Sequence, residues 1–146
     1  MAFRTKENRV EKYDVKILLA LIQSIKGNKR FFHWLMDNGY PELAAFSNTV
    51  RCDRKAQDWL VDHNYGWLAV LSEAIDGNDK ARVWIGRHCH KVNLMLAMAC
   101  RKDPMALKWL YANKLNIFLL MAKEIANVLE VQALENAGPY VMHFGQ

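Results

Sequence analysis

The chain is poor in the residues that punctuate a β-sheet fold. Its 146 residues include seven glycines and three prolines, which is too few for an all-β protein with many tight turns. Hydrophobic residues make up 52% of the chain and charged residues 24%, a composition typical of a globular protein rather than a disordered one. We therefore expect one helical domain, because this length suits a single contiguous core.

Apolar segments with the properties of a leader or a membrane span are also missing. The stretch from Met1 to Arg9 is charged and has no apolar core of the kind found in signal peptides. The apolar run from Val15 to Ile25 is interrupted by Lys16, Gln23 and Ser24 and is too short to cross a bilayer. We expect neither a signal peptide nor a membrane-spanning helix.

Cysteine is scarce, and its spacing suggests no bonded pair. Cys52, Cys89 and Cys100 are odd in number and form no CxxC motif, which indicates reduced thiols in a cytoplasmic protein. The sequence has no Gly-rich phosphate loop, no Gly-x-Ser-x-Gly elbow and no HExxH motif. We therefore expect a protein without enzymatic activity and without a cofactor.

What the sequence does contain is a repeat of 25 residues. Trp34, Trp59, Trp84 and Trp109 are separated by this interval, and a leucine or isoleucine follows each of them. Apolar residues recur nine, twelve and sixteen positions later, with Asn93 as an exception. Their spacing within each unit is typical of two short amphipathic helices. The tryptophans are interpreted as core residues that pack one repeat on the next.

Polar residues predict where the helices begin. Asn28, Asp53, Asn78 and Asp103 lie six residues before the four tryptophans, and Asn and Asp are preferred N-caps because their side chains accept a free backbone N–H. Gly27 and Gly77 precede two of these caps and suit the left-handed end of a helix. The helices are predicted at about 10–26, 29–37, 41–51, 54–63, 67–76, 79–88, 91–101, 104–113 and 116–133.

These patterns predict an all-α protein whose helix-turn-helix units form an α/α solenoid, a right-handed superhelix. One domain, 1–146, would hold repeats at about 9–33, 34–58, 59–83, 84–108 and 109–133, followed by a tail, 134–146. The next position in the series of N-caps is occupied by Val128, which cannot cap a helix. The last helix is therefore expected to be longer and to cover the open end of the array. The apolar tail around Tyr140 to Phe144 is expected to fold back on it.

The repeat resembles an ankyrin repeat that lacks its β-hairpin. The stretch from Leu68 to Asn78 resembles the first ankyrin helix and its Gly-Asn turn, and Lys80 to Ile85 resembles the start of the second helix. The Thr-Pro-Leu-His element is absent, and the ankyrin, HEAT and armadillo repeats are all longer. This architectural resemblance covers most of the chain and implies binding of proteins, or less often nucleic acids, on an extended face.

Candidate protein contacts are the residues that break the pattern. Trp67 is the one tryptophan outside the 25-residue period, and large aromatic residues are enriched at binding hot spots. We predict an exposed indole at Trp67, with Met98 and Glu73 beside it on a concave face. Local packing of Trp67 is the alternative.

The turn formed by His88, Cys89 and His90 contains residue types that bind zinc or act in nucleophilic catalysis. Structural zinc sites need four ligands from well-separated pairs, and catalysis needs a base within hydrogen-bond distance of a stabilised thiolate. Residues adjacent in sequence supply neither geometry, so we predict no metal site here.

Basic residues gather around the cap turns, and the formal net charge of the chain is +5. Equivalent positions of stacked repeats align, so these cations are predicted to form a ridge that could follow a phosphate backbone. The helix dipole also favours such cations at helix ends. The residues of the ridge are Lys26, Lys29, Arg30, Arg51, Arg54, Lys55, Lys80, Arg101 and Lys102.

The sequence leaves three interpretations open. The leading one is a non-enzymatic helical-repeat module that binds a protein or peptide. The second is nucleic-acid binding along the basic ridge, and the third is a scaffold that dimerises through its last helix and tail. No membrane partner is expected, and both a monomer and a homodimer remain open.

Overall fold

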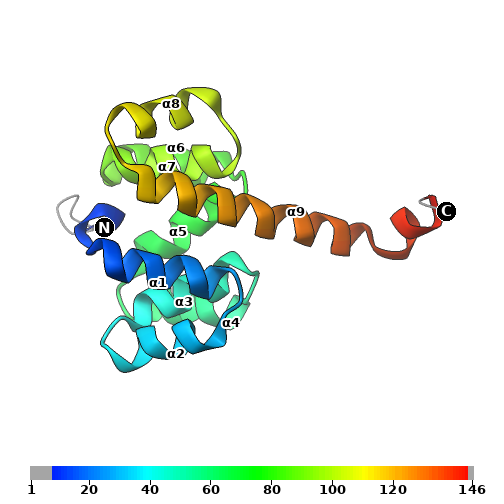
Figure 1. The fold of residues 1–146 in the computed structure, drawn as a ribbon, viewed down its shortest axis with the longest axis horizontal. Coiled ribbons are helices and arrows are strands. Elements are labelled where there is room, and N and C mark those ends of the chain that lie inside the picture. The colour runs from blue at the N-terminus through cyan, green and yellow to red at the C-terminus, as the bar shows by residue number, and fades with distance from the viewer. Residues whose placement is uncertain (1–7, 145–146) are drawn as a thin grey trace.

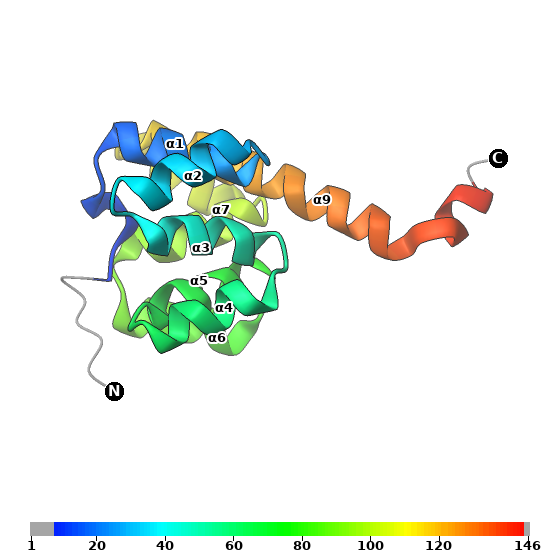
Figure 2. The same cartoon turned by 90° about the horizontal axis from the view of Figure 1, so that it is seen from below.

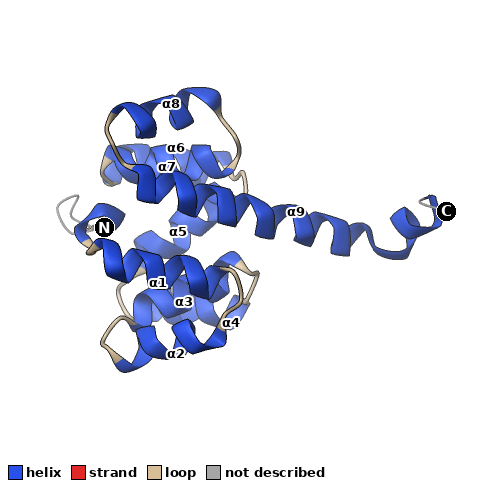
Figure 3. Ribbon diagram, viewed as in Figure 1, coloured by secondary structure: helices blue, strands red, loops and turns tan. Residues whose placement is uncertain are grey.

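A computed structural model describes residues 8–144, and the side chains of residues 8–137, so most of the charged N-terminal stretch lies outside the described part. Within that part the chain forms one 3-10 turn and nine α-helices, and no strand (Figure 3). The all-α prediction is therefore confirmed. The elements are η1 (Val10–Lys12), α1 (Val15–Ile25), α2 (Lys29–Asp37), α3 (Pro41–Val50), α4 (Arg54–Asp62), α5 (Gly66–Ile75), α6 (Asp79–His88), α7 (Lys91–Cys100), α8 (Pro104–Ala112) and α9 (Asn116–Phe144).

The predicted boundaries of the seven middle helices agree with α2 to α8 to within one residue at each end. The first predicted helix, 10–26, is instead divided, because Asp14 is extended, with φ −61° and ψ 149°, and α1 begins after it. The last helix does not end at residue 133. It continues to Phe144, so the predicted tail is helical to that residue and does not fold back.

The predicted cap chemistry is present in all four turns. The side chain of Asn28 accepts a hydrogen bond from the backbone of Arg30, and Asp53, Asn78 and Asp103 make equivalent bonds in α4, α6 and α8. Gly27 has φ +100° and Gly77 has φ +97°, the left-handed conformation that these positions require and that glycine adopts without steric cost.

The odd-numbered helices form a closed central ring. Each of α1, α3 and α5 packs against the next odd-numbered helix, while α9 packs against both α7 and α1 (Figures 1 and 2). The even-numbered helices pack against the outside of this ring. Contact between the last helix and the first distinguishes this arrangement from a row of repeats with two free ends.

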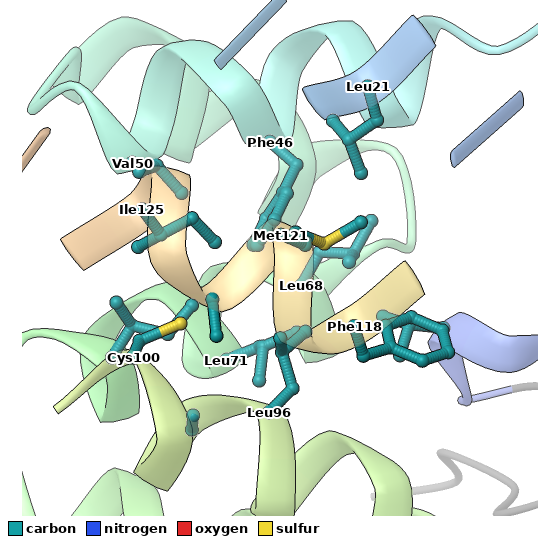
Figure 4. Close-up of a cluster of buried hydrophobic side chains, with 14 of the residues drawn as sticks. Leu21, Phe46, Val50, Leu68, Leu71, Leu96, Cys100, Phe118, Met121 and Ile125 are labelled. Carbon is teal, nitrogen blue, oxygen red and sulfur yellow. The ribbon is translucent and has the colours of Figure 1, made fainter. Parts of the chain in front are cut away.

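Three layers of buried side chains fill the ring (Figure 4). The columns nine, twelve and sixteen residues after the tryptophans supply them, one residue from each central helix, and each side chain is at most 2% exposed. The layers are Leu18, Leu43, Leu68, Asn93 and Phe118; Leu21, Phe46, Leu71, Leu96 and Met121; and Ile25, Val50, Ile75, Cys100 and Ile125.

The four periodic tryptophans lie at the edge of the core. Trp59, Trp84 and Trp109 are partly buried and pack against the core, as the repeat predicts, whereas Trp34 is 37% exposed and departs from that prediction. Trp59 stacks on His63 with ring centroids 4.0 Å apart. The residue that follows each tryptophan is fully buried, so the leucine–isoleucine column joins the outer helices to the ring: Leu35, Leu60, Ile85 and Leu110.

Residues 8–13, here called the N-terminal strap, are anchored at the ends of the central helices where those helices begin. Asn93 replaces an apolar residue in its layer; its Oδ1 accepts from the backbone N of Val10 at 3.0 Å, and its Nδ2 donates to the carbonyl of Asn8 at 3.0 Å. The hydroxyl of Tyr13 donates to the buried carboxylate of Glu42 at 2.7 Å. Burial and this carboxylate both raise the pKa of Tyr13.

The second half of α9 leaves the helical body (Figures 1 and 2). Its side chains are mostly exposed between Glu130 and Ala137, including the apolar Val131 and Leu134. Gln132 links its base to the body, since its Nε2 donates to the carbonyl of Val50 at 3.1 Å. Within the described residues, no helix combines the length and hydropathy that a bilayer span requires.

Candidate functional site: a groove between α2 and α4

The predicted protein contact at Trp67 is wrong, because its side chain is 2% exposed. The equivalents of Trp67 in α3 and α7, Glu42 and Val92, are buried too. The strap adds cover, with the ammonium of Lys12 5.7 Å from the centroid of the Trp67 ring. The alternative of local packing therefore describes Trp67.

Met98 and Glu73 do not lie beside Trp67 or beside each other in one site. Glu73 is exposed at the end of α5, and half-buried Met98 is near the end of α7. Each lines a separate hollow at the turn between a central helix and the following outer helix. The three predicted partner residues therefore do not form a common contact surface. The two hollows, however, lie at equivalent positions of successive repeats.

This series consists of three equivalent hollows, each placed between two neighbouring cap turns. The first has a volume of about 390 Å³ and lies between the end of α1, the start of α2 and the end of α3. Lys29, His33 and Arg51 line it together with Asn28, Asn48 and Phe32, and no carboxylate does so among the described residues. The first hollow is therefore cationic.

The same positions one repeat later form the second hollow, which has the opposite charge. It measures about 270 Å³, and Arg54 occupies the position of Lys29, while Glu73 and Asp76 occupy those of Asn48 and Arg51. With Asp53, three carboxylates face one cation. Loss of water around the Asp76 carboxyl raises its pKa, an effect that Arg101 opposes and Glu73 reinforces.

The third hollow, of about 420 Å³, has mixed charge. It is lined by three cations, Arg82, Arg101 and Lys102, and by two carboxylates, Asp79 and Asp103. The backbone creates the hollow in each repeat, and the side chains at equivalent positions decide its charge. A ligand that needs a cationic pocket would therefore distinguish the first hollow from the other two.

An apolar hollow adjoins the first one. It measures about 240 Å³ between α2, α3 and α4, and Phe32 and Asn48 line both hollows. Its other apolar walls are Met36, Pro41, Ala45, Ala56 and Trp59. The two hollows together, here called the α2–α4 groove, place cationic and apolar surfaces side by side.

The residues that form this groove are particular to the first repeat. The positions of Phe32 and Met36 are taken by Gln57 and Val61 in α4 and by Arg82 and Gly86 in α6. In α8 these positions hold Leu107 and Tyr111, so the pair of Phe and Met occurs in the first repeat and in none of these later helices. Met is a side chain that adapts its shape to different ligands.

The nine predicted basic residues are all exposed, but three of them have partners inside the protein. The guanidinium of Arg51 donates to the carbonyl of Ile25 at 2.8 Å, and that of Arg101 donates to the carbonyl of Ile75 at 3.2 Å. Lys102 pairs with Glu130 of α9. The two arginine contacts satisfy carbonyl groups at helix ends, so part of the ridge stabilises the fold.

The His88, Cys89 and His90 side chains have different partners. His88 packs on Trp84 with centroids 4.7 Å apart, and His90 Nδ1 lies 3.4 Å from Glu11 Oε2. Burial raises the pKa of Cys89 to about 11, with a hydrogen bond to Asn93 opposing the rise. Its thiol is therefore protonated at neutral pH. The described residues contain no group of three or more His, Cys, Asp or Glu side chains suited to hold a metal.

Of the residues that line the α2–α4 groove, the sequence analysis named three as candidate contacts: Lys29, Arg51 and Lys55. One sequence feature could have indicated this surface. The equivalent positions Asn48, Glu73, Met98 and Lys123 differ in charge or polarity in every repeat. Positions that vary in charge while the surrounding core columns stay apolar indicate a surface that differs from repeat to repeat.

Comparison with protein families, with curated proteins and with solved structures found no match to this chain.

Proposed function

We propose that the chain is a non-enzymatic helical-repeat module that binds a protein segment or peptide in the α2–α4 groove. One observation carries this proposal: the cationic first hollow adjoins an apolar hollow of about 240 Å³. The 25-residue unit and its four cap turns support the solenoid-like interpretation of the architecture. The closed ring leaves the outer helices as the surface that such a module would use.

The charge and shape of the groove define its occupant. The partner is a segment with an acidic group beside a large apolar side chain. The acidic group would lie near Lys29 and Arg51, and the apolar side chain would enter between Met36 and Trp59. Apolar side chains that fill a pocket supply most of the affinity in such contacts, and complementary charge supplies selectivity.

The test is selection from a random peptide display library, followed by affinity measurements on one selected peptide. We expect enriched peptides to combine an acidic residue with an aromatic or large aliphatic one. The substitution Met36→Glu should weaken binding roughly 30-fold, because a carboxylate would replace an apolar wall and repel the acidic group. Met36 is 47% exposed, so the variant is expected to fold.

The matched control is Val61→Glu, at the equivalent position of α4, where the side chain is 57% exposed. It adds the same charge outside the groove and should leave the affinity within about twofold, the usual range for surface substitutions. Selection that enriches no sequence, or equal losses in the two variants, would contradict the proposal.

Nucleic-acid binding is a second candidate, favoured by five exposed cations in the first two cap turns: Lys26, Lys29, Arg30, Arg54 and Lys55. None of the five takes part in an ion pair within the described residues. If all five contact phosphates, affinity for duplex DNA should fall by about two to three orders of magnitude between 50 and 200 mM salt. Fluorescence anisotropy with a labelled duplex measures this. Absence of binding at 50 mM salt would eliminate this candidate.

A further inference from the structure

We infer that the first hollow is a binding site for a phosphate group. The inference deepens the proposed function, because it names the acidic group that a bound segment would present there. That a bound segment carries the phosphate depends on the proposed function. That the hollow binds phosphate depends on the residues of the hollow.

The charge of the hollow suits a dianion. Lys29 and Arg51 provide two permanent cations, and the imidazole of His33 adds a ring N–H donor. Asn28 and Asn48 contribute side-chain amides to the same lining. A single carboxylate would leave one of the two permanent charges uncompensated, whereas a phosphate monoester carries nearly two negative charges at neutral pH and three acceptor oxygens.

The geometry of Arg51 is fixed before any ligand arrives. Its Nη1 donates to the carbonyl of Ile25 at 2.8 Å, which restrains a guanidinium that lines the first hollow and has further N–H groups able to bond a ligand. Such preorganisation reduces the entropy lost on binding. The N-terminus of α2 lies at the same hollow, and its dipole adds positive potential.

The second hollow is the internal comparison. It has the same backbone origin, but Asp76 stands where the first hollow has Arg51, and Glu73 stands where it has Asn48. Carboxylates at these two positions repel a phosphate and attract the one cation, Arg54. A phosphate ion should therefore distinguish two sites that lie 25 residues apart on the same chain.

The experiment is an NMR titration of the ¹⁵N-labelled protein with inorganic phosphate, against sodium chloride at equal ionic strength. We expect saturable shifts of the amides of Gly27, Lys29 and Asn48, and no saturable shift of Cys52, Arg54 and Glu73. The variant Lys29→Gln should weaken phosphate binding about tenfold, the effect of losing one charged hydrogen bond. The matched variant Arg54→Gln should not. Equal shifts at both hollows, or unchanged affinity in Lys29→Gln, would overturn the inference.

Two further titrations show whether the phosphate is a free ion or part of a peptide. They also test peptide binding and phosphate binding independently of each other. A selected peptide with phosphoserine in place of its acidic residue should bind more tightly than the original peptide and should be displaced by inorganic phosphate. Saturable binding of inorganic phosphate without binding of any peptide would support the inference and contradict the proposed function. Peptide binding that inorganic phosphate and phosphoserine leave unchanged would support the function and overturn the inference.

Discussion

Replacement of Met121 by alanine should lower the free energy of unfolding by about 2–5 kcal/mol, the range for truncating a fully buried methionine. Met121 is 0% exposed in the middle layer of the ring (Figure 4). It belongs to α9, which packs against both α7 and α1, so a cavity there weakens the contact that closes the ring. Urea denaturation followed by circular dichroism at 222 nm measures the loss.

The control is the neighbouring residue of the same helix. Leu120 is 43% exposed, and Leu120→Ala should cost less than about 1 kcal/mol, since little buried surface is removed. Both substitutions replace one apolar side chain of α9 by the same small residue. If the two variants were equally stable, α9 would not close the core as described.

Replacement of Asn93 by alanine should cost about 3 kcal/mol and release the N-terminal strap. The substitution removes two hydrogen bonds and leaves the backbone groups of Asn8 and Val10 without partners, at about 1–3 kcal/mol for each buried group. Hydrogen exchange of the Val10 amide should accelerate well beyond the change caused by lower global stability. Denaturation measures the loss of global stability, and hydrogen exchange at Val10 measures the local release of the strap.

A second substitution, Asn93→Leu, distinguishes the packing of the layer from the anchoring of the strap. Leucine is the residue that the equivalent column holds in α3 and α5, so it restores an apolar layer while removing both hydrogen bonds. We expect a smaller loss of global stability than for Asn93→Ala, with the same acceleration at Val10. Unchanged protection of Val10 in both variants would show that Asn93 does not hold the strap.

The local structure could be predicted from the sequence because its signals are local. Asn28 and Asp53 cap their helices as predicted, since an N-cap depends on bonds within one turn. The end of α9 could not be found in this way. Gly138 and Pro139 normally stop a helix, yet α9 runs through both to Phe144.

Closure of the ring could not be predicted, because it depends on the small rotation between successive repeats, which the sequence pattern does not encode. Trp67 shows a related limit: the sequence places it outside the period, but its side chain is 2% exposed and lies beside Lys12 of the strap, 55 positions earlier in the chain. The α2–α4 groove shows the same limit. Lys29 and Arg51 were identified as basic, whereas their shared hollow with Phe32 and Asn48 is a tertiary feature.

Binding of a peptide in the α2–α4 groove, as proposed, can be observed by NMR of the protein labelled with ¹³C at its methionine methyl groups and titrated with a selected peptide. Met36 lines the groove, and Met105 is 75% exposed at the start of α8. Binding in the groove predicts that the Met36 methyl resonance shifts to saturation while that of Met105 stays in place. If the resonance of Met105 or Met98 shifted while that of Met36 stayed in place, the peptide would bind elsewhere and the α2–α4 groove would not be its site.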